Sequence, residues 1–435
     1  MLCGKLVDEE IGIEYLAIDS CIRFVFQLDG CHIVTVEGLN AAHTGTENLS
    51  GVQQAMIDCH GSQCGFCTPG FVVAMTGILE AEDSPSVDDW RHGLTGNLYR
   101  CTGYSPIIAA GEKSNRQNTP AMNQVYPPQA IAKFVQPIRE DAIQIESNSG
   151  PNRQLISSPT SIADAVRFLA QHPEAQIVAG ATDVGVQFNK RRCDATVWLD
   201  LNRIADLNGV AVDDNAIVAG AGATWTQLES LTKELVSQFH EIISIFGSPQ
   251  IRHVGTIGGN IINASPIADS LPFLFVCDAE LEIANQSGTR NVSINDFYQG
   301  YKEFDLQPGE LLAKIRIPLP AADTQLRLYK VSRRRDLDIS TFTAAIAIGL
   351  QGDKITSAAI AYGAVGPVVL RLPKTEQFLT GKEFSIATMK PAGDVAVAEI
   401  TPISDVRGSE DFRLQLARNV LQKFYYEIAA QEVTA

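Results

Sequence analysis

The sequence lacks any apolar run long enough to cross a membrane. A membrane-spanning helix needs about 20 consecutive apolar residues, and no such run occurs in the 435 residues. The first ten residues, MLCGKLVDEE, have neither the basic start nor the apolar core of an export signal. We therefore expect no membrane association and a location in the cytoplasm.

Positive charge is also scarce. The chain has 34 lysines and arginines against 50 acidic residues, which gives a formal net charge of −16. Binding to nucleic acid requires clustered Lys and Arg against the phosphates. The sequence offers only two short basic runs, Lys190 to Arg192 and Arg333 to Arg335, and the first is interpreted as a solvated loop. The composition therefore argues against a nucleic-acid partner.

Cysteine is the residue present in an informative pattern. Nine cysteines in a chain without an export signal indicate reduced thiols, so they are metal ligands or small buried side chains rather than a disulfide framework. Cys64 and Cys67 in GSQCGFCTPG are two residues apart, which lets both thiolates reach one iron, and Gly65 permits the tight backbone. By itself such a pair is equally compatible with half of a zinc site or with core packing.

A glycine-rich stretch, QIRHVGTIGGNIINASPIAD, extends from Gln250 to Asp269. Glycine at positions 255, 258 and 259 lets the backbone turn tightly and approach another group. Short polar side chains and backbone N–H groups on the same stretch can form a concavity for an anion, and these side chains are Thr256, Asn260 and Ser265. The stretch favours a phosphate-bearing cofactor, although it lacks the GxGxxG spacing. GTIGGN by itself is better explained as a glycine-rich loop between buried strands.

A second polar turn occurs in IVAGATDVGVQ, from Ile177 to Gln187. A short apolar run precedes Gly180, Thr182 and Asp183, which predicts a buried strand that opens into a tight turn. Elsewhere, Ser86 with Asp89 and Ser161 with Asp164 predict capped helix starts. ELLAKIRIPLP predicts an alternating strand, and DFRLQLARNVLQKFYYEIA predicts a C-terminal helix. The length allows about three domains.

These motifs together resemble the molybdenum hydroxylases. The similarity rests on SQCGFCTPG followed by GNLYRCTGY, on the two glycine-containing stretches in this order, and on PISDVRGSEDFR near the C-terminus. It extends over the whole chain, which resembles the small subunit of bacterial xanthine dehydrogenases, the subunit that carries FAD and two [2Fe-2S] centres but no molybdenum cofactor.

The resemblance implies an α+β multidomain fold. Its expected parts are the truncated remnant of a plant-type β-grasp ferredoxin domain (1–40), a helical [2Fe-2S]-binding domain (41–118), a linker (119–152), an α+β FAD-binding domain of the vanillyl-alcohol-oxidase type (153–325) and a C-terminal α+β flavoprotein domain (326–435).

By the resemblance, Cys3 and Cys21 take the third and fourth ligand positions of the first [2Fe-2S] centre. The first two ligands are expected upstream of Met1, so the ferredoxin domain is expected to be truncated at its N-terminus.

By the same resemblance, Cys64, Cys67 and Cys101 are ligands of the second centre, and Tyr99 stands where the family has a fourth cysteine. Each iron of a [2Fe-2S] cluster normally has two protein ligands, so one thiolate is missing. Cys59 or the phenolate of Tyr99 could replace it, and both are less favoured than a labile or absent cluster.

The resemblance also assigns a flavin site. Asp269 matches a residue that hydrogen-bonds the cofactor, Phe246 an aromatic residue near the flavin, and Leu312 an apolar residue on the ring system. The FAD pyrophosphate and ribityl groups are expected against Val178, Ala179, Gly180, Ala181, Thr182, Asp183, Thr256, Gly259 and Asn260.

The segment YKVSRRRDLDIS, Tyr329 to Ser340, is explained by its composition as an exposed charged turn. The resemblance adds that Lys330 and Arg334 lie near the flavin and that the acidic residues flanking Leu337 govern access for NAD. Tyr301 matches an aromatic residue at the NAD site, although an aromatic residue in this context is more often part of a core.

The function implied is that of an electron-transfer subunit. A molybdopterin-binding large subunit would oxidise hypoxanthine and xanthine, and electrons would pass through the [2Fe-2S] centres and FAD to NAD+, in a hetero-oligomer. No acid, base or nucleophile on this chain need touch the purine. Two alternatives are a flavin subunit of another molybdenum hydroxylase, acting on an aldehyde or an N-heterocycle, and a non-catalytic flavin-binding protein with a defective relay.

We predict that Tyr99→Cys increases the iron bound by the chain, because it restores the fourth thiolate of the second centre. Iron and acid-labile sulfide per chain, measured after anaerobic reconstitution, check this prediction. Cys59→Ser in the Tyr99→Cys background is the control and is expected to leave the gain unchanged. An unchanged iron content in Tyr99→Cys would contradict the assignment of position 99 as the missing ligand.

Overall fold

The computed structural model describes residues 1–7, 12–40, 49–101, 103–148 and 153–434. The chain forms two compact units, each built from separate segments. Unit 1 contains residues 1–160, 175–203 and 247–255, and unit 2 contains residues 161–174, 204–246 and 256–435. The first residues of the expected helical domain, 41–48, and the end of the expected linker, 149–152, lie outside the described residues.

Unit 1 begins with an antiparallel sheet in the order β2-β1-β3. Its strands are β1 (Leu2–Val7), β2 (Gly12–Ala17) and β3 (His32–Val34), and Leu2 pairs with both Ala17 and Val34. Three short 3-10 helices accompany it, η1 (Ser20–Ile22), η2 (Val25–Leu28) and η3 (Glu37–Asn40). The sheet buries its apolar face on the helical part of the same unit.

The helical part of unit 1 contains α1 (Gly51–Asp58), α2 (Thr68–Ala81), α3 (Val87–Gly93) and α4 (Ser105–Lys113). Ser86 caps α3 and exchanges hydrogen bonds with Asp89, so the predicted capping box is confirmed. Proline lies in the first turn of α2 and of α4, where its missing N–H costs nothing. These helices pack around the fully buried Trp90 and Phe71.

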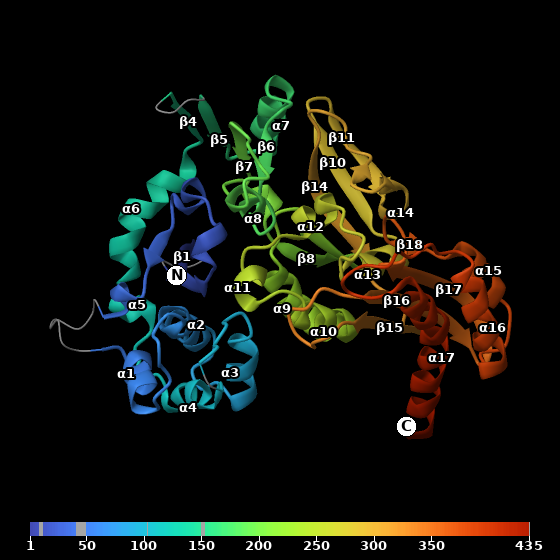
Figure 1. Ribbon diagram of the computed structural model, residues 1–435. Helices are drawn as coiled ribbons and strands as arrows, with labels where there is room; N and C mark the ends of the chain where they lie inside the picture. Colours follow the sequence, from blue (N-terminus) through green and yellow to red (C-terminus); the bar gives the residue numbers. More distant parts are fainter. Residues whose placement is uncertain (8–11, 41–48, 102, 149–152, 435) are drawn as a thin grey trace. The chain divides into compact units, whose positions relative to one another are not determined.

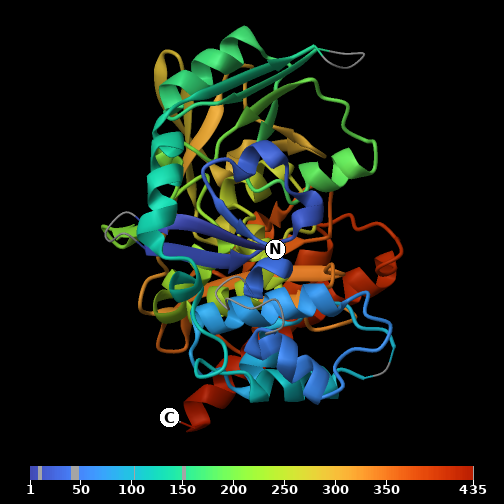
Figure 2. The same cartoon turned by 90° about the vertical axis from the view of Figure 1, so that its left-hand side faces the viewer.

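The segment expected as a linker contains regular structure. It forms α5 (Met122–Val125), α6 (Pro128–Glu140) and β4 (Ile143–Ser147). Pro128 opens α6 at a position that favours proline. α6 lies alongside β1 and β2 (Figure 2), and Arg139 donates a hydrogen bond to the Leu6 carbonyl at 2.9 Å. Apolar residues recur at helical spacing along α6, from Ile131 to Ile138, so the linker expectation overlooked a local apolar period.

The second sheet of unit 1 has the order β4-β5-β7-β6. Its remaining strands are β5 (Gln154–Ser158), β6 (Gln176–Val178) and β7 (Val197–Asp200), of which β7 runs parallel to both β5 and β6. Two short helices complete the unit, α8 (Val184–Asn189) and α11 (Pro249–Arg252). The parallel pair places the carboxyl ends of β6 and β7 at one edge of the sheet.

Unit 2 contains a five-stranded antiparallel sheet in the order β11-β10-β14-β9-β8. Its strands are β8 (Val210–Asp213), β9 (Ala216–Gly220), β10 (Glu280–Asn285), β11 (Gly288–Ser293) and β14 (Leu311–Pro318), and the two-stranded sheet of β12 (Tyr298–Gly300) and β13 (Glu303–Phe304) belongs to the same unit. The accompanying helices are α7 (Ile162–Gln171), η4 (Ala205–Leu207), α9 (Trp225–Leu235), α10 (Ser237–Ile245), α12 (Ile257–Asn263), α13 (Leu271–Val276) and α14 (Ile294–Phe297).

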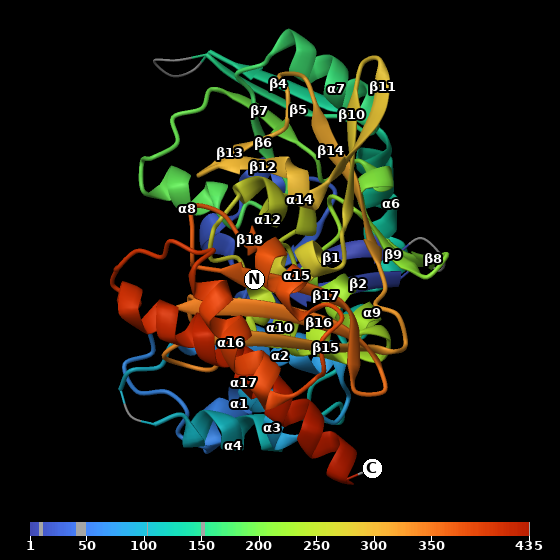
Figure 3. The same ribbon diagram turned by 90° about the vertical axis from the view of Figure 1, so that its right-hand side faces the viewer.

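The C-terminal part of unit 2 is a four-stranded antiparallel sheet with helices across one face (Figures 1 and 3). Its strands are β15 (Thr324–Val331), β16 (Phe342–Gln351), β17 (Lys354–Gly363) and β18 (Leu370–Arg371), and its helices are α15 (Pro373–Leu379), α16 (Ile386–Val397) and α17 (Glu410–Thr434). The core between the two layers includes the fully buried Phe342, Tyr362 and Phe424. No helix in the described ranges combines the length and the hydropathy needed to span a bilayer.

Two sequence-based expectations for unit 2 have different outcomes. Ser161 caps α7 by accepting from the Asp164 N–H, as predicted. GTIGGN, expected on its own to be a loop between strands, instead forms the start of α12, because Thr256 accepts the Gly259 N–H and caps the helix.

A charged network connects β11 with the residues that precede β14. Arg290 of β11 donates to Glu310 at 2.9 and 2.7 Å and to Asp305 at 2.8 Å. The side chain of Glu310 is only 6% exposed, and its contact with Arg290 lowers its pKa from 4.5 to about 2. The network ties the start of β14 to β11.

We predict that Glu310→Gln lowers the free energy of unfolding by about 2 kcal/mol at neutral pH. The folded-state pKa is depressed, so the stabilisation is present above pH 4.5 and is lost as the pH falls through about 2. Chemical denaturation of wild type and variant at several pH values between neutral and strongly acidic checks this. Glu282→Gln, which removes a more exposed pair with Lys314, is the control and should cost less than about 1 kcal/mol. A pH-independent difference for Glu310→Gln would contradict the prediction.

Candidate functional site

The loop Val178 to Asp183 begins where β6 ends, at the carboxyl edge of the parallel strands of unit 1. Val178 is fully buried, and Ala181 has a left-handed backbone with φ 62°. A non-glycine residue in this conformation is strained, and such residues cluster at binding sites. Gly180 approaches the chain closely, because a Cβ there would lie 2.2 Å from the Val254 carbonyl oxygen. The predicted loop is therefore shaped by a tight backbone contact within unit 1.

The two consecutive carbonyls of this loop are held by side chains from elsewhere in unit 1. Gln27 and Asn202 donate to the Ala179 carbonyl oxygen at 2.7 and 3.0 Å. Arg23 donates to the Gly180 carbonyl oxygen at 3.2 Å and to the Asn202 side-chain oxygen at 3.1 Å. The sequence did not single out these three donors, because two of them lie more than 150 residues before the loop.

The second glycine-rich stretch continues into unit 2 as α12. A Cβ on Gly258 would lie 2.5 Å from the Ala221 carbonyl oxygen, so this glycine permits close packing inside the unit. Asn260, which follows the capped first turn, accepts a hydrogen bond from Ser270 at 2.6 Å. Ala264 ends the helix with φ 50°, a second non-glycine residue in the left-handed region.

Lys330 and Asp269, two predicted site residues, meet in unit 2. Lys330 Nζ lies 2.5 Å from Asp269 Oδ2, and their side chains are 2% and 9% exposed. The ammonium group also donates to the Asp338 carbonyl and to Ser340 Oγ, both at 2.8 Å. Ser340 Oγ in turn donates to Asp269 Oδ1 at 2.5 Å. A buried ion pair of this kind is stable because its other hydrogen-bonding positions are filled.

The loop from Ser332 to Ile339 contacts this pair through the Asp338 carbonyl and carries several charged side chains. Arg334 has a side chain that is 75% exposed, and its backbone N–H donates to Asp338 at 3.0 Å. Leu337 has φ 61°, and its N–H donates to the Ile245 carbonyl at 3.2 Å. Each of the three predicted flavin segments thus contains a strained non-glycine residue.

The remaining predicted flavin residues occupy different environments. The Phe246 and Trp225 rings meet edge to face with centroids 4.8 Å apart. Leu312 is buried in β14, where its cross-strand neighbour is Ile283. Tyr301 is 63% exposed, which excludes the core interpretation for that position.

Three further predicted residues begin α8 and α12. Thr182 is half-buried, and Asp183 is exposed at the start of α8, where it accepts from Gln187. A Cβ on Gly259 would lie 2.8 Å from Thr256 Oγ1.

The cysteines of the expected second centre form a pair rather than a set of four. Cys64 and Cys101 are exposed, and their sulfur atoms lie 3.4 Å apart. The Phe66 N–H lowers the pKa of Cys64, whereas burial raises the pKa of Cys67. The Cys59 and Cys67 side chains pack on the apolar core. Within the described ranges, no three His, Cys, Asp or Glu side chains gather into a metal-binding group.

Tyr99 lies in the aromatic core of the helical part. It is 5% exposed and packs edge to face against Phe71 and Tyr104, with centroids 6.4 and 5.8 Å away. Its backbone N–H donates to the Tyr104 hydroxyl at 3.0 Å. The residues present do not fit a [2Fe-2S] cluster with four thiolates, and no electron-transfer step is assigned to this site.

The expected first centre also shows an unexpected pairing. Cys3 is buried on β1 and donates to Cys31, and this hydrogen bond raises the pKa of Cys3 and lowers that of Cys31 to about 6. Cys21 is exposed in η1, where its carbonyl accepts from Asn189 at 2.6 Å. Cys31 is a sulfur neighbour that the sequence did not single out.

The flavin segments, in contrast, carry features that fit a phosphate-bearing cofactor. The buried Nε atom of Arg23 has no hydrogen-bond partner in the described part of the chain, beside a loop with a strained Ala181. An unpaired guanidinium donor and strained backbone are typical of a site completed by an anion.

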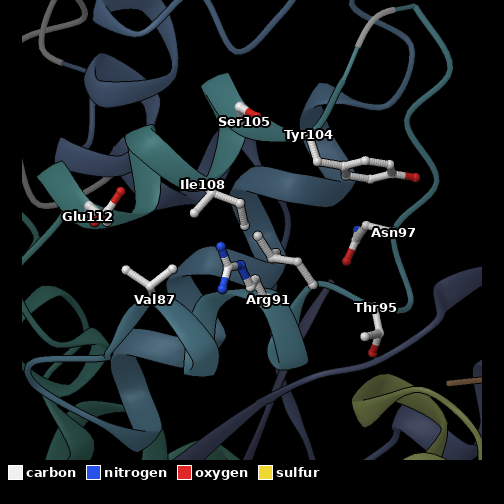
Figure 4. Close-up of a pocket in the computed structure, with 9 residues that line it drawn as sticks. Val87, Arg91, Thr95, Asn97, Tyr104, Ser105, Ile108 and Glu112 are labelled. Carbon is white, nitrogen blue, oxygen red and sulfur yellow. The ribbon is translucent and has the colours of Figure 1, made fainter. Parts of the chain in front are cut away.

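A cavity of about 520 Å³ lies between α3 and α4 of the helical part (Figure 4). Apolar Val87, Leu94 and Ile108 line it together with Arg91 and Tyr104. No predicted cofactor or metal residue contributes to this cavity.

Comparison with known families identifies three regions of the chain. Residues 35–112 match the family described as a [2Fe-2S] binding domain. Residues 152–320 match the FAD binding domain in molybdopterin dehydrogenase, and residues 327–428 match the CO dehydrogenase flavoprotein C-terminal domain. The chain thus combines a [2Fe-2S]-binding domain with an FAD-binding domain, and the α+β multidomain prediction is confirmed.

Relatives support the same class. The chain is 27% identical over 486 residues to xanthine dehydrogenase 1 of Arabidopsis thaliana, a match that covers 94% of this chain and 35% of that protein. It therefore spans about a third of the length of the curated relatives it matches. Reconstituted CO dehydrogenase from Oligotropha carboxidovorans is 30% identical with a TM-score of 0.58, over 61% of this chain and 94% of the solved chain. Quinoline 2-oxidoreductase from Pseudomonas putida 86 is 27% identical with a TM-score of 0.58, over 63% of this chain and 96% of the solved chain.

The chain belongs to the molybdenum hydroxylase family.

We predict that Lys330→Met lowers the free energy of unfolding by about 3–5 kcal/mol, because it leaves the Asp269 carboxylate buried without its cation. The double variant Lys330→Met with Asp269→Leu should be more stable than Lys330→Met alone. Chemical denaturation of the FAD-free chain checks both statements. Lys423→Met, which removes the exposed pair with Glu427, is the matched control and should cost less than about 1 kcal/mol. An equal loss in the single and double variants would contradict the role of the ion pair.

Proposed function

We propose that this chain is the FAD-bearing subunit of a xanthine dehydrogenase and transfers the electrons of purine oxidation to NAD+. The observation that carries the proposal is the order of the matched regions along one chain. A [2Fe-2S]-binding region, an FAD-binding region and a flavoprotein C-terminal region follow one another, and 94% of the chain aligns with a xanthine dehydrogenase. The domain boundaries proposed from the sequence, at 40, 118, 152 and 325, follow the same order.

The loop from Val178 to Asp183 and the segment from Thr256 to Asn260 are proposed to bind the pyrophosphate and ribityl groups of FAD. Asp269 would contact the cofactor from its buried pair with Lys330. Phe246 and Leu312 are proposed to face the ring system. FAD, when bound, supplies the chemistry of accepting electrons singly or in pairs and giving them up as hydride.

Access to the nicotinamide side is proposed to depend on the loop from Ser332 to Ile339. Arg334 is exposed and is proposed to lie near the flavin, and the exposed Tyr301 is proposed to contact NAD. Lys330 anchors this loop, because its ammonium group donates to the Asp338 carbonyl. The side chains of this chain bind and orient; none of them needs to act as an acid, base or nucleophile on the purine.

The partner is proposed to be a separate molybdopterin-binding large subunit, in a hetero-oligomer located in the cytoplasm. The support is that the matched families assign residues 35–112, 152–320 and 327–428 to [2Fe-2S] binding, FAD binding and a flavoprotein C-terminal domain. The purine site is therefore proposed to lie outside these residues. The chain is also 25% identical to aldehyde oxidase of Homo sapiens over 96% of its length. An aldehyde is therefore proposed as an alternative substrate of the partner, to be tested beside purines.

A second function is favoured by the cysteine geometry. Cys64 and Cys101 pair, whereas Cys67 packs on the core and Tyr99 is buried among aromatic rings. This arrangement favours a flavin-binding protein whose iron–sulfur relay is defective. The two functions share the FAD site and differ in iron content.

We predict that the purified chain binds FAD without its partner. Asn260→Ala combined with Gly259→Val should remove the visible flavin absorbance, because the valine side chain would collide with the Thr256 cap. Asn291→Ala, an exposed position on β11 of the same unit, is the control and should retain FAD. Wild-type protein that stays colourless after incubation with excess FAD would contradict the proposed function.

The ratio of iron and labile sulfide to flavin, measured anaerobically in the presence of the partner, separates the two functions. Two or more irons per flavin, as one complete [2Fe-2S] centre requires, would support the relay. Flavin with almost no iron would support the flavin-binding protein.

A further inference from the structure

We infer that Arg23 is a positioning residue for FAD: it fixes the Gly180 carbonyl and brings a positive charge to the loop that faces the cofactor's pyrophosphate. This inference rests on the proposed FAD site. It assigns a task to the N-terminal segment, which resembles part of a ferredoxin domain, that does not depend on any iron–sulfur centre.

The hydrogen bonds of Arg23 converge on one point of unit 1. One guanidinium nitrogen donates to the Gly180 carbonyl at 3.2 Å and the other donates to the Asn202 side-chain oxygen at 3.1 Å. Asn202 in turn donates to the Ala179 carbonyl at 3.0 Å. Arg23 therefore restrains two neighbouring peptide groups, one directly and one through Asn202. The next residue is Ala181, which has the strained left-handed backbone.

Apolar packing holds the same segment against the loop. The Phe24 and Phe26 rings stack with centroids 5.1 Å apart, and Phe24 packs against Trp198 at 5.0 Å. Val178 and Ala181 belong to this cluster of buried side chains. A Cβ on Gly185 would lie 2.2 Å from the Ile22 carbonyl oxygen, so α8 also fits closely against the segment. The segment cannot move away from the loop without uncovering this cluster.

The guanidinium group has capacity for one more acceptor. Its Nε atom is buried and has no hydrogen-bond partner in the described part of the chain. Asn202, which accepts from Arg23, donates in turn to the buried carboxylate of Asp200 at 2.5 Å. Burial lowers the pKa of Arg23, whereas Asp200, Cys3 and Cys31 raise it. Arginine stays charged in proteins, so the loop carries a fixed cation suited to a dianionic pyrophosphate.

The test compares variants of the full chain prepared without FAD and titrated with FAD, with binding followed by flavin fluorescence. Arg23→Gln should weaken FAD binding by about tenfold or more, the effect of losing a charged hydrogen-bond donor. Arg23→Lys keeps the charge and should recover most of that loss. Arg203→Gln is the matched control: Arg203 is also in unit 1, and its hydrogen bonds go to the Ile138 and Asp141 carbonyls and to Asp29 rather than to the loop. It should bind FAD as wild type does.

Hydrogen exchange over residues 177–185 of the FAD-free chain gives a second measurement that works even if Arg23→Gln folds poorly. Arg23→Lys should speed exchange there more than Arg203→Gln does, because the forked donor is lost. FAD affinity unchanged in Arg23→Gln, or equally reduced in Arg203→Gln, would overturn the inference and leave the proposed function standing. Failure of the wild-type chain to bind FAD would overturn both.

Discussion

Two adjacent backbone carbonyls, those of Ala179 and Gly180, join separate segments of unit 1 by accepting hydrogen bonds from their side chains. Three side-chain donors from distant parts of the sequence meet there, and the flanking residues Val178 and Ala181 belong to the buried cluster around Trp198. An unsatisfied buried carbonyl would cost about 1–3 kcal/mol. The N-terminal segment is therefore part of the scaffold of the flavin loop, and its retention in the chain has a physical reason apart from iron binding.

Local signals in the sequence predicted the elements that depend on local chemistry. The capped starts of α3 and α7 were predicted from Ser86 and Ser161, since a cap is complete within four residues. The helix α6 was missed although its apolar residues from Ile131 to Ile138 have helical spacing, because the paired prolines Pro127 and Pro128 favoured a linker. The helical start of GTIGGN was missed because glycine has a low helix propensity, which the Thr256 cap overcomes.

Some residues of the candidate site were predicted from the sequence, and others were found only in the structure. Resemblance supplied the residues on the glycine-containing stretches, and the structure brings Lys330 and Asp269 together as a buried pair. Arg23, Gln27 and Ser340 could not be found from the sequence, because their role depends on long-range contacts between polar residues of ordinary appearance. Cys31 is similar: only the strand pairing beside β1 makes it a neighbour of Cys3. Tyr99 was recognised as a departure, but its burial against Phe71 required coordinates.

The discontinuous path of the chain has a consequence for its biosynthesis. Unit 1 is built from residues 1–160, 175–203 and 247–255. Phe24 packs against Val178, Ala181 and Trp198 of the second segment, so it leaves the ribosome well before the residues that cover it. Domains usually fold in order as they emerge, yet this one must wait with an aromatic surface uncovered. The aromatic cluster around Phe24 is therefore completed only after residues 178–198 have been synthesised.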